Sequence, residues 1–374
     1  MKVFDLANNL VQLGHRVVLF APHVGYPRQQ TLAEVMEVPV PDVWGLRQLV
    51  FQLVLFWIAC YRCVREKPDL IYVRIMPSLI PLLLAKAFRL PLCLEVNDDP
   101  YGEATPTGVT GAIGAIGRWI NHLYFRLSDS VLPATCGIGR KLCLYDGTPD
   151  DRITVLSSGA NVELCRPLAK GECRRTLKLD PAGPYVGFLG TLFGHQGVHI
   201  MVQCAPRVLA QFPMTRFLVV GDGPMRMMLE EQVHQAGLSD AFIFTGHVAY
   251  ECVPVYVGAM DLCVAPFMAE RGETSPVKLF DTLACGRPVI ASDIEAVRQV
   301  FEGPHCGVVF VPPEQPEALA SAVRELLADQ QRAADLGVVG RQFVVTRHNR
   351  TRVAHTVIDV CLARHRGSPT QAAI

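Results

Sequence analysis

Between Glu273 and Ser292 the chain reads Glu-Thr-Ser-Pro-Val-Lys-Leu-Phe-Asp-Thr-Leu-Ala-Cys-Gly-Arg-Pro-Val-Ile-Ala-Ser. Ser275 and Pro276 are residue types that favour the N-cap and the first turn of a helix, and Gly286 is the type that most often ends one. The apolar residues after Gly286 are typical of a buried strand. The stretch therefore predicts a helix followed by a strand, which is the repeating unit of an α/β fold.

A second apolar run, residues 261–266, precedes this helix and is also predicted to be a strand. In a parallel sheet the helix then begins at the carboxyl edge, where free backbone N–H groups and the positive end of the helix dipole favour a phosphate. Lys278 adds a full charge in the first turn, and Asp281 lies on the same face roughly 4.5 Å further along the axis. A diphosphate at the helix start would leave a ribose near Asp281, with Glu273 placed toward whatever the outer phosphate carries.

Short apolar runs alternate with helical stretches over most of the chain. The predicted strands are 16–20, 70–74, 91–96, 130–134 and 153–157 in the first half, and 185–189, 216–220, 242–245, 261–266, 288–291 and 308–311 in the second. This alternation predicts parallel sheets, so the expected fold class is α/β with two Rossmann-like domains. We place an N-terminal domain at 1–168, a C-terminal domain at 169–346, and a last helix at 347–366 that packs back on the N-terminal domain.

The composition fits this organisation and excludes several classes of protein. The 374 residues are enough for two domains, and 35 Lys and Arg balance 35 Asp and Glu, which argues against a nucleic-acid partner. Hydrophobic residues make up 50% and charged residues only 19%, which favours buried parallel sheets or contact with lipid. Thirteen unevenly spaced cysteines do not suit a secreted disulfide framework, so we expect a cytoplasmic protein.

No metal site is expected from the cysteines and histidines. Cys60 and Cys63 form a C-x2-C pair, but no second pair stands at zinc spacing. His195 and His199 lack the Glu of a zinc-protease helix motif. We interpret the two cysteines as thiols in the core of a helix.

One apolar segment raises the question of a membrane. Residues 48–61 are fourteen residues between Arg47 and Arg62, shorter than the roughly 20 needed to span a bilayer. Residues 62–89 contain six basic residues and two acidic ones. One interpretation is therefore an apolar helix beside a basic patch that binds anionic lipid at the inner face of the membrane. The other interpretation is a helix that is buried on all sides.

The N-terminus lacks an element that the pattern calls for. Val3, Leu6, Leu10 and Leu13 mark one helical face before any strand has appeared. In the βαβ units of Rossmann-like domains, such a helix follows a strand and a Gly-rich turn, and it covers that strand. We therefore expect that the first strand of the N-terminal domain is missing, that Met1 is an internal or misassigned start, and that roughly 15 to 30 residues lie upstream.

Residues 273–292 resemble the family of retaining GT-B glycosyltransferases called glycosyl transferases group 1 (family 4-like). That family carries Glu-x7-Glu in a helix and strand that read much like S-P-x-K-L-F-E-Y-x-A-C-G-x-P-V-I-A-S. The chain matches this pattern at Ser275, Pro276, Lys278, Leu279, Phe280, Ala284, Cys285, Gly286, Pro288, Val289, Ile290, Ala291 and Ser292. The resemblance extends over nearly the whole chain and implies two Rossmann-like domains that face each other across a cleft.

The resemblance also implies an activity and a set of residues. It implies transfer of a sugar from a nucleotide-sugar donor with retention of configuration, without a metal or other cofactor. Glu273 would contact the donor sugar near the reacting carbon, Lys278 and the helix start would hold the diphosphate, and Asp281, where the family has Glu, would hold the ribose. The donor-binding residues would be Gly190, Thr191, Gly194, Gly221, Asp222, Gly223, Ser275, Pro276, Val277, Leu279 and Asp281.

Two glycine-rich turns match the family less closely. Gly190-Thr-Leu-Phe-Gly-His-Gln-Gly197 stands where the family has G-R-L-x-x-x-K-G, so Thr191 and Gln196 replace the Arg and Lys that clamp the diphosphate. His195 or the backbone N–H groups of this loop are the candidates to compensate. The sequence 221–224, Gly-Asp-Gly-Pro, follows a predicted strand and resembles the family's G-x-G-P turn beside the nucleotide, with a helix expected to begin at its proline.

Three residues of the first half are candidates for the acceptor side. Arg74, Glu95 and Asn97 fall at the carboxyl ends of predicted strands and resemble the Y-x-R and E-x-N strand ends of a subgroup of the family. An equally weighted alternative is that they only tie loops together. Asn97-Asp-Asp99 also resembles the metal-binding motif of the other glycosyltransferase fold, but the two sheet repeats favour the metal-free design.

The expected function is therefore sugar transfer to a glycan or lipid-linked acceptor, in surface polysaccharide or glycolipid synthesis. Two alternatives remain open. The same fold and donor site would serve a sugar-nucleotide epimerase or hydrolase. An inactive GT-B subunit that binds a partner enzyme would also explain Thr191, Gln196, Asp281 and the missing strand.

Overall fold

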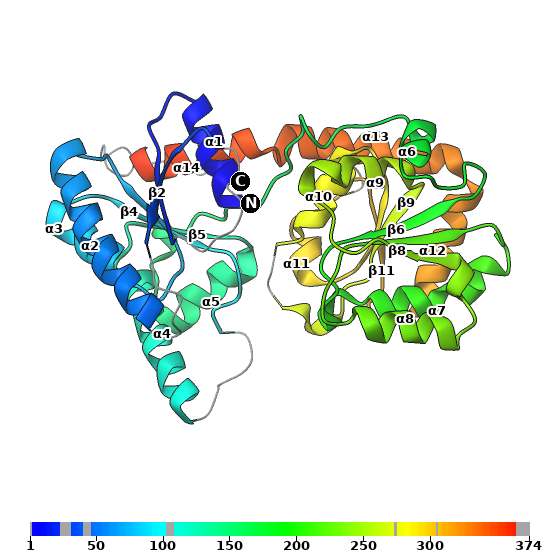
Figure 1. Ribbon diagram of the computed structural model, residues 1–374, viewed down its shortest axis with the longest axis horizontal. Helices are drawn as coiled ribbons and strands as arrows, with labels where there is room; N and C mark the ends of the chain where they lie inside the picture. The colour runs from blue at the N-terminus through cyan, green and yellow to red at the C-terminus, as the bar shows by residue number, and fades with distance from the viewer. Residues whose placement is uncertain are drawn as a thin grey trace. The chain divides into compact units, whose positions relative to one another are not determined.

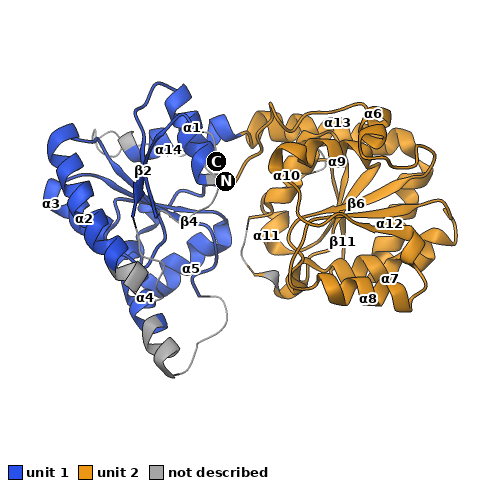
Figure 2. Ribbon diagram, viewed as in Figure 1, with its two compact units in different colours: residues 1–157, 350–374 blue, residues 158–349 orange. Residues whose placement is uncertain are grey.

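The computed structural model describes residues 2–22, 31–39, 46–101, 108–272, 275–303 and 306–363. It forms two compact units: unit 1 comprises residues 1–157 and 350–374, and unit 2 comprises residues 158–349 (Figure 2). The boundary at 157/158 lies eleven residues before the predicted one, and the segment that returns to unit 1 begins at Arg350 instead of residue 347. Both units are α/β (Figure 1).

Unit 2 contains one six-stranded parallel sheet in the order β11-β10-β9-β6-β7-β8. Its strands are β6 (Tyr185–Leu189), β7 (Arg216–Val220), β8 (Phe242–Phe244), β9 (Leu262–Ala265), β10 (Val289–Ser292) and β11 (Val308–Val311). The six strands predicted for this half are confirmed, with ends that differ by one residue at most. The strand order reverses between β6 and β9, and in such sheets ligands bind outside the carboxyl ends at this switch point.

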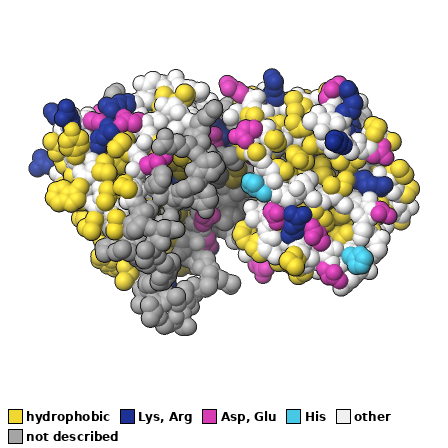
Figure 3. Space-filling model, viewed as in Figure 1, with side chains coloured by type: hydrophobic (Ala, Val, Ile, Leu, Met, Phe, Trp, Pro, Cys, Tyr) yellow, Lys and Arg dark blue, Asp and Glu magenta, His cyan; other side chains and the backbone are white. Residues whose placement is uncertain are grey.

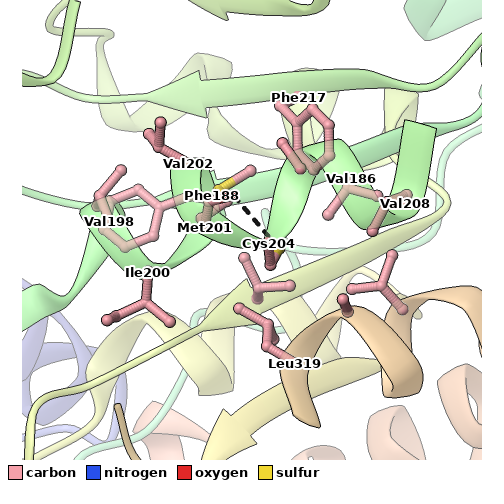
Figure 4. Packing of buried hydrophobic residues seen from close by; sticks show 14 of the residues in the cluster. Val186, Phe188, Val198, Ile200, Met201, Val202, Cys204, Val208, Phe217 and Leu319 are labelled. Carbon is pink, nitrogen blue, oxygen red and sulfur yellow. Dashed lines mark hydrogen bonds between the residues drawn. The ribbon is translucent and has the colours of Figure 1, made fainter. Parts of the chain in front are cut away.

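Helices cover both faces of this sheet (Figure 1). They are α6 (Lys170–Thr176), α7 (Val198–Leu209), α8 (Arg226–Gln235), α9 (Val253–Ala259), α10 (Val277–Ala284), α11 (Glu295–Arg298), α12 (Pro316–Ala328) and α13 (Gln330–Arg347). On one face Phe188 and Phe217 pack with Met201 and Cys204 of α7 and Leu319 of α12 (Figure 4). Burial of both faces explains why the strands read as continuous apolar runs in the sequence.

The elements of unit 1 alternate in the same way. They are α1 (Lys2–Gln12), β1 (Val18–Pro22), β2 (Glu34–Val38), α2 (Leu46–Glu66), β3 (Ile71–Arg74), α3 (Ile80–Phe88), β4 (Leu92–Val96), α4 (Gly108–Leu127), β5 (Ser130–Pro133), α5 (Cys136–Asp146) and α14 (Arg350–Ala363). The strands form two parallel sheets, β1-β2 and β3-β4-β5. Within the described residues β1 and β3 are not paired, and the expectation of a missing strand before α1 stays a prediction.

Three details of unit 1 differ from the sequence prediction. β1 begins at Val18, two residues later than predicted. β2 was not predicted, because its two glutamates interrupt the apolar run. The strand predicted at 153–157 is wrong: Ile153 forms only an isolated bridge with Val131. The N–H groups of Thr154 and Leu156 still donate to β5 carbonyls, so the segment follows the sheet edge without forming a regular strand.

The last helix, α14, packs against α1 within unit 1. Arg350 pairs with Asp5 across this contact at 2.5 Å.

Cys93 of β4 and Cys361 of α14 are joined as a disulfide with Cα atoms 6.2 Å apart, and the other eleven cysteines are free. Burial raises the pKa of the Cys204 and Cys263 thiols to about 12, so these two behave as core residues.

Candidate active site

Three loops meet at the carboxyl edge of the unit 2 sheet. β6 leads into Gly190, β7 leads into Gly221, and β9 leads into the segment that enters α10. The Leu192 N–H donates to the carbonyl of Asp222 at 2.9 Å, and the Leu192 carbonyl accepts from the Met225 N–H at 3.0 Å. The first two loops are therefore joined by their backbones.

Glycines permit this close approach. A Cβ at Gly221 would lie 2.0 Å from the carbonyl oxygen of Gly190, and a Cβ at Gly223 would lie 2.7 Å from the Leu192 nitrogen. Gly190 and Gly221 have φ angles of 138° and 137°, which L side chains rarely adopt. The structure thus brings the two glycine-rich turns of the sequence into one site, with backbone in place of side chains at its floor.

Lys278 reaches this floor from the first turn of α10. Its Nζ lies 3.9 Å from the ring centroid of Phe188 and 5.1 Å from that of Phe267, both within the range of cation–π attraction. A Cβ at Gly190 would lie 2.9 Å from the same Nζ. Because both rings are fully buried, they form a rigid wall that holds the ammonium group beside the Gly190 backbone. Phe188 and Phe267 were not predicted as site residues, because no local sequence pattern marks them.

The start of α10 differs from its prediction. The helix begins at Val277, with Pro276 in the N-cap position and without a side-chain capping bond, so the predicted cap at Ser275 is wrong. The N–H groups of Val277 and Leu279 donate to the carbonyls of Ser275 and Pro276 at 2.9 and 3.0 Å. Two N–H groups expected to be free for a phosphate are thus engaged. Glu273 lies outside the described residues.

The remainder of α10 serves the core. The side chain of Leu279 is buried in the hydrophobic cluster of this face of the sheet, and a contact of Leu279 with a donor stays a prediction. Gly286 has a φ of +74° and its N–H donates to the Leu283 carbonyl at 2.8 Å, which confirms the predicted end of the helix. The helix is therefore fixed in position behind Lys278.

Asp281 is buried, with 6% of its surface exposed. Its Oδ1 accepts a hydrogen bond from the Tyr250 hydroxyl at 2.9 Å, and the Cys165 Sγ lies 3.7 Å from the same oxygen. Tyr250 begins a short 3-10 helix after β8. The carboxylate is therefore oriented by two residues that the sequence analysis did not select, and its contact with a ribose stays a prediction.

The loop after β6 carries Thr191 and Gln196, the two residues that differ from the family pattern. Thr191 and Gly194 are exposed. His195 accepts the Met268 N–H through its carbonyl at 3.1 Å, and its ring stacks on Phe193 with centroids 5.6 Å apart. The loop is thus fastened to the chain that follows β9, and the imidazole of His195 lies against an aromatic face.

Asp222 has a local role in the loop after β7. Its Oδ1 accepts the Gly223 N–H at 2.8 Å, and its Oδ2 accepts from Arg226 at 2.9 Å. These two bonds hold the pKa of the Asp222 carboxyl below its ordinary value. α8 begins at Arg226 and not at Pro224 as predicted. Asp222 therefore stabilises the turn that carries Gly221 and Gly223.

The acceptor-side candidates lie at the carboxyl edge of the three-stranded sheet of unit 1. Arg74 pairs in register with Glu95, and its Nε lies 3.7 Å from Glu95 Oε2. The Tyr72 hydroxyl donates to the same oxygen at 2.9 Å. Burial, together with the Glu95 charge, raises the pKa of Tyr72 well above its ordinary value. The structure brings Arg74 and Glu95 into contact, while Asn97 follows β4 with its Nδ2 buried.

A cavity of about 480 Å³ lies at the opposite edge of the unit 2 sheet, near the starts of β6, β9 and β10. Asp261 lines it and accepts from Lys170 at 2.5 Å and from Arg174 at 2.7 Å. The Tyr185 N–H donates to the same carboxylate at 2.7 Å. Because these charges already satisfy one another, we assign this cavity a structural role.

The switch point of this doubly wound sheet carries two glycine-rich loops and a fixed lysine, in a chain with a second α/β unit. This combination is typical of a two-domain α/β enzyme of the GT-B type. Residues 183–329 match the family model of glycosyl transferases group 1, and residues 2–159 match that of the glycosyl transferase 4-like domain. The chain belongs to this family and is a glycosyltransferase.

Curated relatives carry names of the same class. The chain is 25% identical over 255 residues to alpha-D-kanosaminyltransferase of Streptomyces kanamyceticus, covering 67% of this chain and 65% of that one. It is 26% identical to 2-deoxystreptamine N-acetyl-D-glucosaminyltransferase of Streptomyces fradiae, over 89% of this chain and 83% of the relative. A GDP-mannose-dependent alpha-(1-6)-phosphatidylinositol monomannoside mannosyltransferase of Mycobacterium tuberculosis is 27% identical over 56% of each chain.

Solved structures show the same fold. Sucrose-phosphate synthase from Thermosynechococcus elongatus superposes with a TM-score of 0.78 at 19% identity, over 98% of this chain and 93% of that one. HepE from Anabaena, in complex with UDP and glucose, superposes with a TM-score of 0.74 at 17% identity, over 97% and 95% of the two chains. These likenesses extend over both units.

Proposed function

We propose that the protein transfers a sugar from a nucleotide-sugar donor to a glycan or lipid-linked acceptor, with retention of configuration, in the cytoplasmic synthesis of a surface polysaccharide or glycolipid. The observation that carries this proposal is the position of Lys278, whose Nζ lies against Gly190 where the loops after β6 and β7 meet. A named relative that acts on a phosphatidylinositol mannoside supports a lipid-linked acceptor.

The proposed catalysis depends on the negative charge of the leaving phosphate. When the bond between the sugar and the diphosphate breaks, negative charge grows on the leaving phosphate. A preorganised cation and backbone dipoles stabilise that charge best when they are fixed before the reaction, because no reorganisation is then needed. Lys278 meets this condition, since Phe188 and Phe267 hold its ammonium group in place. Lys278 is therefore the residue to which we assign stabilisation of the leaving group.

In the reaction that we propose, the acceptor hydroxyl attacks from the face that the diphosphate leaves. The new C–O bond forms as the bond to the diphosphate breaks, and the leaving phosphate oxygen accepts the hydroxyl proton. No separate general base is required. Glu273 is assigned to the donor sugar near the reacting carbon, and Arg74, Glu95 and Asn97 to the acceptor side.

Asp281 gives a prediction for donor binding. Removing the charge with Asp281→Asn should raise the dissociation constant of the nucleoside diphosphate about tenfold, as expected for loss of a hydrogen bond to a charged group. Asp281→Glu, the residue of the family, should bind at least as well as the parent. Isothermal titration calorimetry measures both.

Tyr250→Phe is the matched control for Asp281. It removes the hydroxyl that donates to Asp281 but keeps the carboxylate, so it should weaken binding less than Asp281→Asn. Equal affinity in all four proteins would show that Asp281 serves the fold alone. The melting temperature of each variant separates loss of binding from loss of structure.

The function is tested by transfer of label from radiolabelled nucleotide sugars to glycan and lipid-linked acceptors. We expect acceptor-dependent incorporation, with the anomeric configuration of the donor preserved in the product by NMR. Release of free sugar without an acceptor would instead indicate a hydrolase, and a changed sugar an epimerase. Nucleotide binding without turnover of any donor would indicate an inactive partner subunit.

A further inference from the structure

The outer face of α2 is apolar. Leu53, Trp57, Tyr61 and Val64 have between 57% and 71% of their surface exposed. At 100° per residue these four side chains lie within about 80° of one another around the helix, so they form one line, which we call the α2 stripe. A helix at a protein surface normally turns polar residues to water.

The opposite face of α2 packs into unit 1. Three of its buried side chains lie with residues of β2 and α3 in one hydrophobic cluster, and they are Phe51, Leu55 and Ala59. The expectation that the whole helix is buried is therefore wrong for one of its faces. The described residues of unit 1 therefore leave the four stripe side chains uncovered.

A neighbouring helix adds to this surface. α3 packs against α2 and exposes Leu83. Figure 3 shows hydrophobic side chains gathered over the part of unit 1 where Figure 1 places α2 and α3, with a group of Lys and Arg side chains beside them. An exposed surface that combines tryptophan, tyrosine and aliphatic side chains is typical of an interaction site.

The charges at the C-terminal end of α2 are mainly positive. Arg65 is exposed and lies over the Tyr61 ring at 5.9 Å, with a hydrogen bond of 3.0 Å to the Tyr61 hydroxyl. Exposed basic residues continue from there into α3 and its end, and they are Lys67, Lys86 and Arg89. On the acidic side, Glu66 is half-buried and pairs with Arg62, and Asp69 is exposed.

We propose that the α2 stripe docks unit 1 on an anionic lipid surface, with α2 lying in the plane of the interface. Aromatic and aliphatic side chains on one helix face, next to Lys and Arg, are the features of helices that bind such interfaces. Within the described residues, no helix combines the length and the hydrophobicity that crossing a bilayer requires. A second copy of this chain is a less suitable partner for the stripe. A two-fold symmetric interface here would bring the basic residues of the two copies close together, and their like charges would repel.

The test is flotation with phosphatidylcholine vesicles, with and without phosphatidylglycerol, in the absence of any donor sugar. We expect the protein to float with the anionic vesicles at low salt and to be partly released at high salt, because salt screens the attraction. Trp57→Gln should lower the bound fraction about tenfold by removing the largest stripe side chain. The double variant Arg65→Gln with Lys67→Gln should lower binding to the anionic vesicles only.

Val338→Gln is the matched control, because Val338 is equally exposed, at 69%, but lies on α13 of unit 2. It should float like the parent protein. Absence of flotation, or equal flotation of Trp57→Gln, would overturn the proposal. So would a dimer in analytical ultracentrifugation that Trp57→Gln dissociates, since the stripe would then bind a second copy. The readout needs no catalysis, so it is independent of the proposed sugar transfer.

Discussion

Lys278→Ala is expected to lower kcat/KM for sugar transfer by about 10²- to 10³-fold, the usual cost of removing one preorganised group that stabilises developing charge. The ammonium group is held between the Phe188 ring and the Gly190 backbone, so its charge is fixed at the site floor before the reaction begins. Binding of the nucleoside diphosphate should weaken by about 1.5 to 3 kcal/mol, the range for hydrogen bonds to a charged group. Steady-state kinetics and calorimetry measure the two effects separately.

Two further variants decide how Lys278 acts. Phe188→Leu keeps the charge but removes the ring that orients it, so we expect a smaller loss, mainly in kcat. Arg332→Ala removes one exposed charge from α13 and should change neither binding nor rate. If Lys278→Ala bound the diphosphate as tightly as the parent, Lys278 would have to be removed from the donor site.

Arg174→Ala is expected to destabilise unit 2 by about 3 kcal/mol, the lower end of the cost of breaking a buried ion pair. Only 7% of the Arg174 side chain is exposed. Its guanidinium donates to Asp261 at 2.7 Å and to the carbonyls of Ala259 and Pro181 at 3.0 and 2.9 Å, and it lies 4.7 Å over the Tyr185 ring. We expect the lower end of this range of destabilisation because Asp261 still pairs with Lys170 in the Arg174→Ala variant.

Arg175→Ala is the matched control for this prediction. Arg175 is the next residue of α6, its side chain is 72% exposed, and among the described residues its ion-pair partner is Glu172, one turn away. Exposed pairs of this kind contribute little, so the free energy of unfolding should change by less than about 0.5 kcal/mol. Denaturant unfolding followed by circular dichroism compares the two. Equal stability of both variants would mean that the buried network adds nothing to unit 2.

Local residue patterns were enough to predict the fold class and the strands of unit 2. Its strands are buried on both faces, so each reads as a short apolar run that needs no knowledge of its neighbours. The end of α10 at Gly286 and the position of Lys278 near its start also follow from residues close in the chain. The same local rules failed for β2, where two glutamates interrupt the apolar run.

The partners of the site residues depended on packing between distant segments. Phe188 lies ninety residues before Lys278, and Tyr250 lies thirty-one residues before Asp281, and only the order and register of the strands bring each pair together. Exposure of the α2 stripe was likewise undecided, because the sequence of an apolar helix is the same whether one face or both are covered. The residue type determines how much free energy a side chain gains when it is buried away from water. Which side chains are buried depends on the helices and strands that surround them.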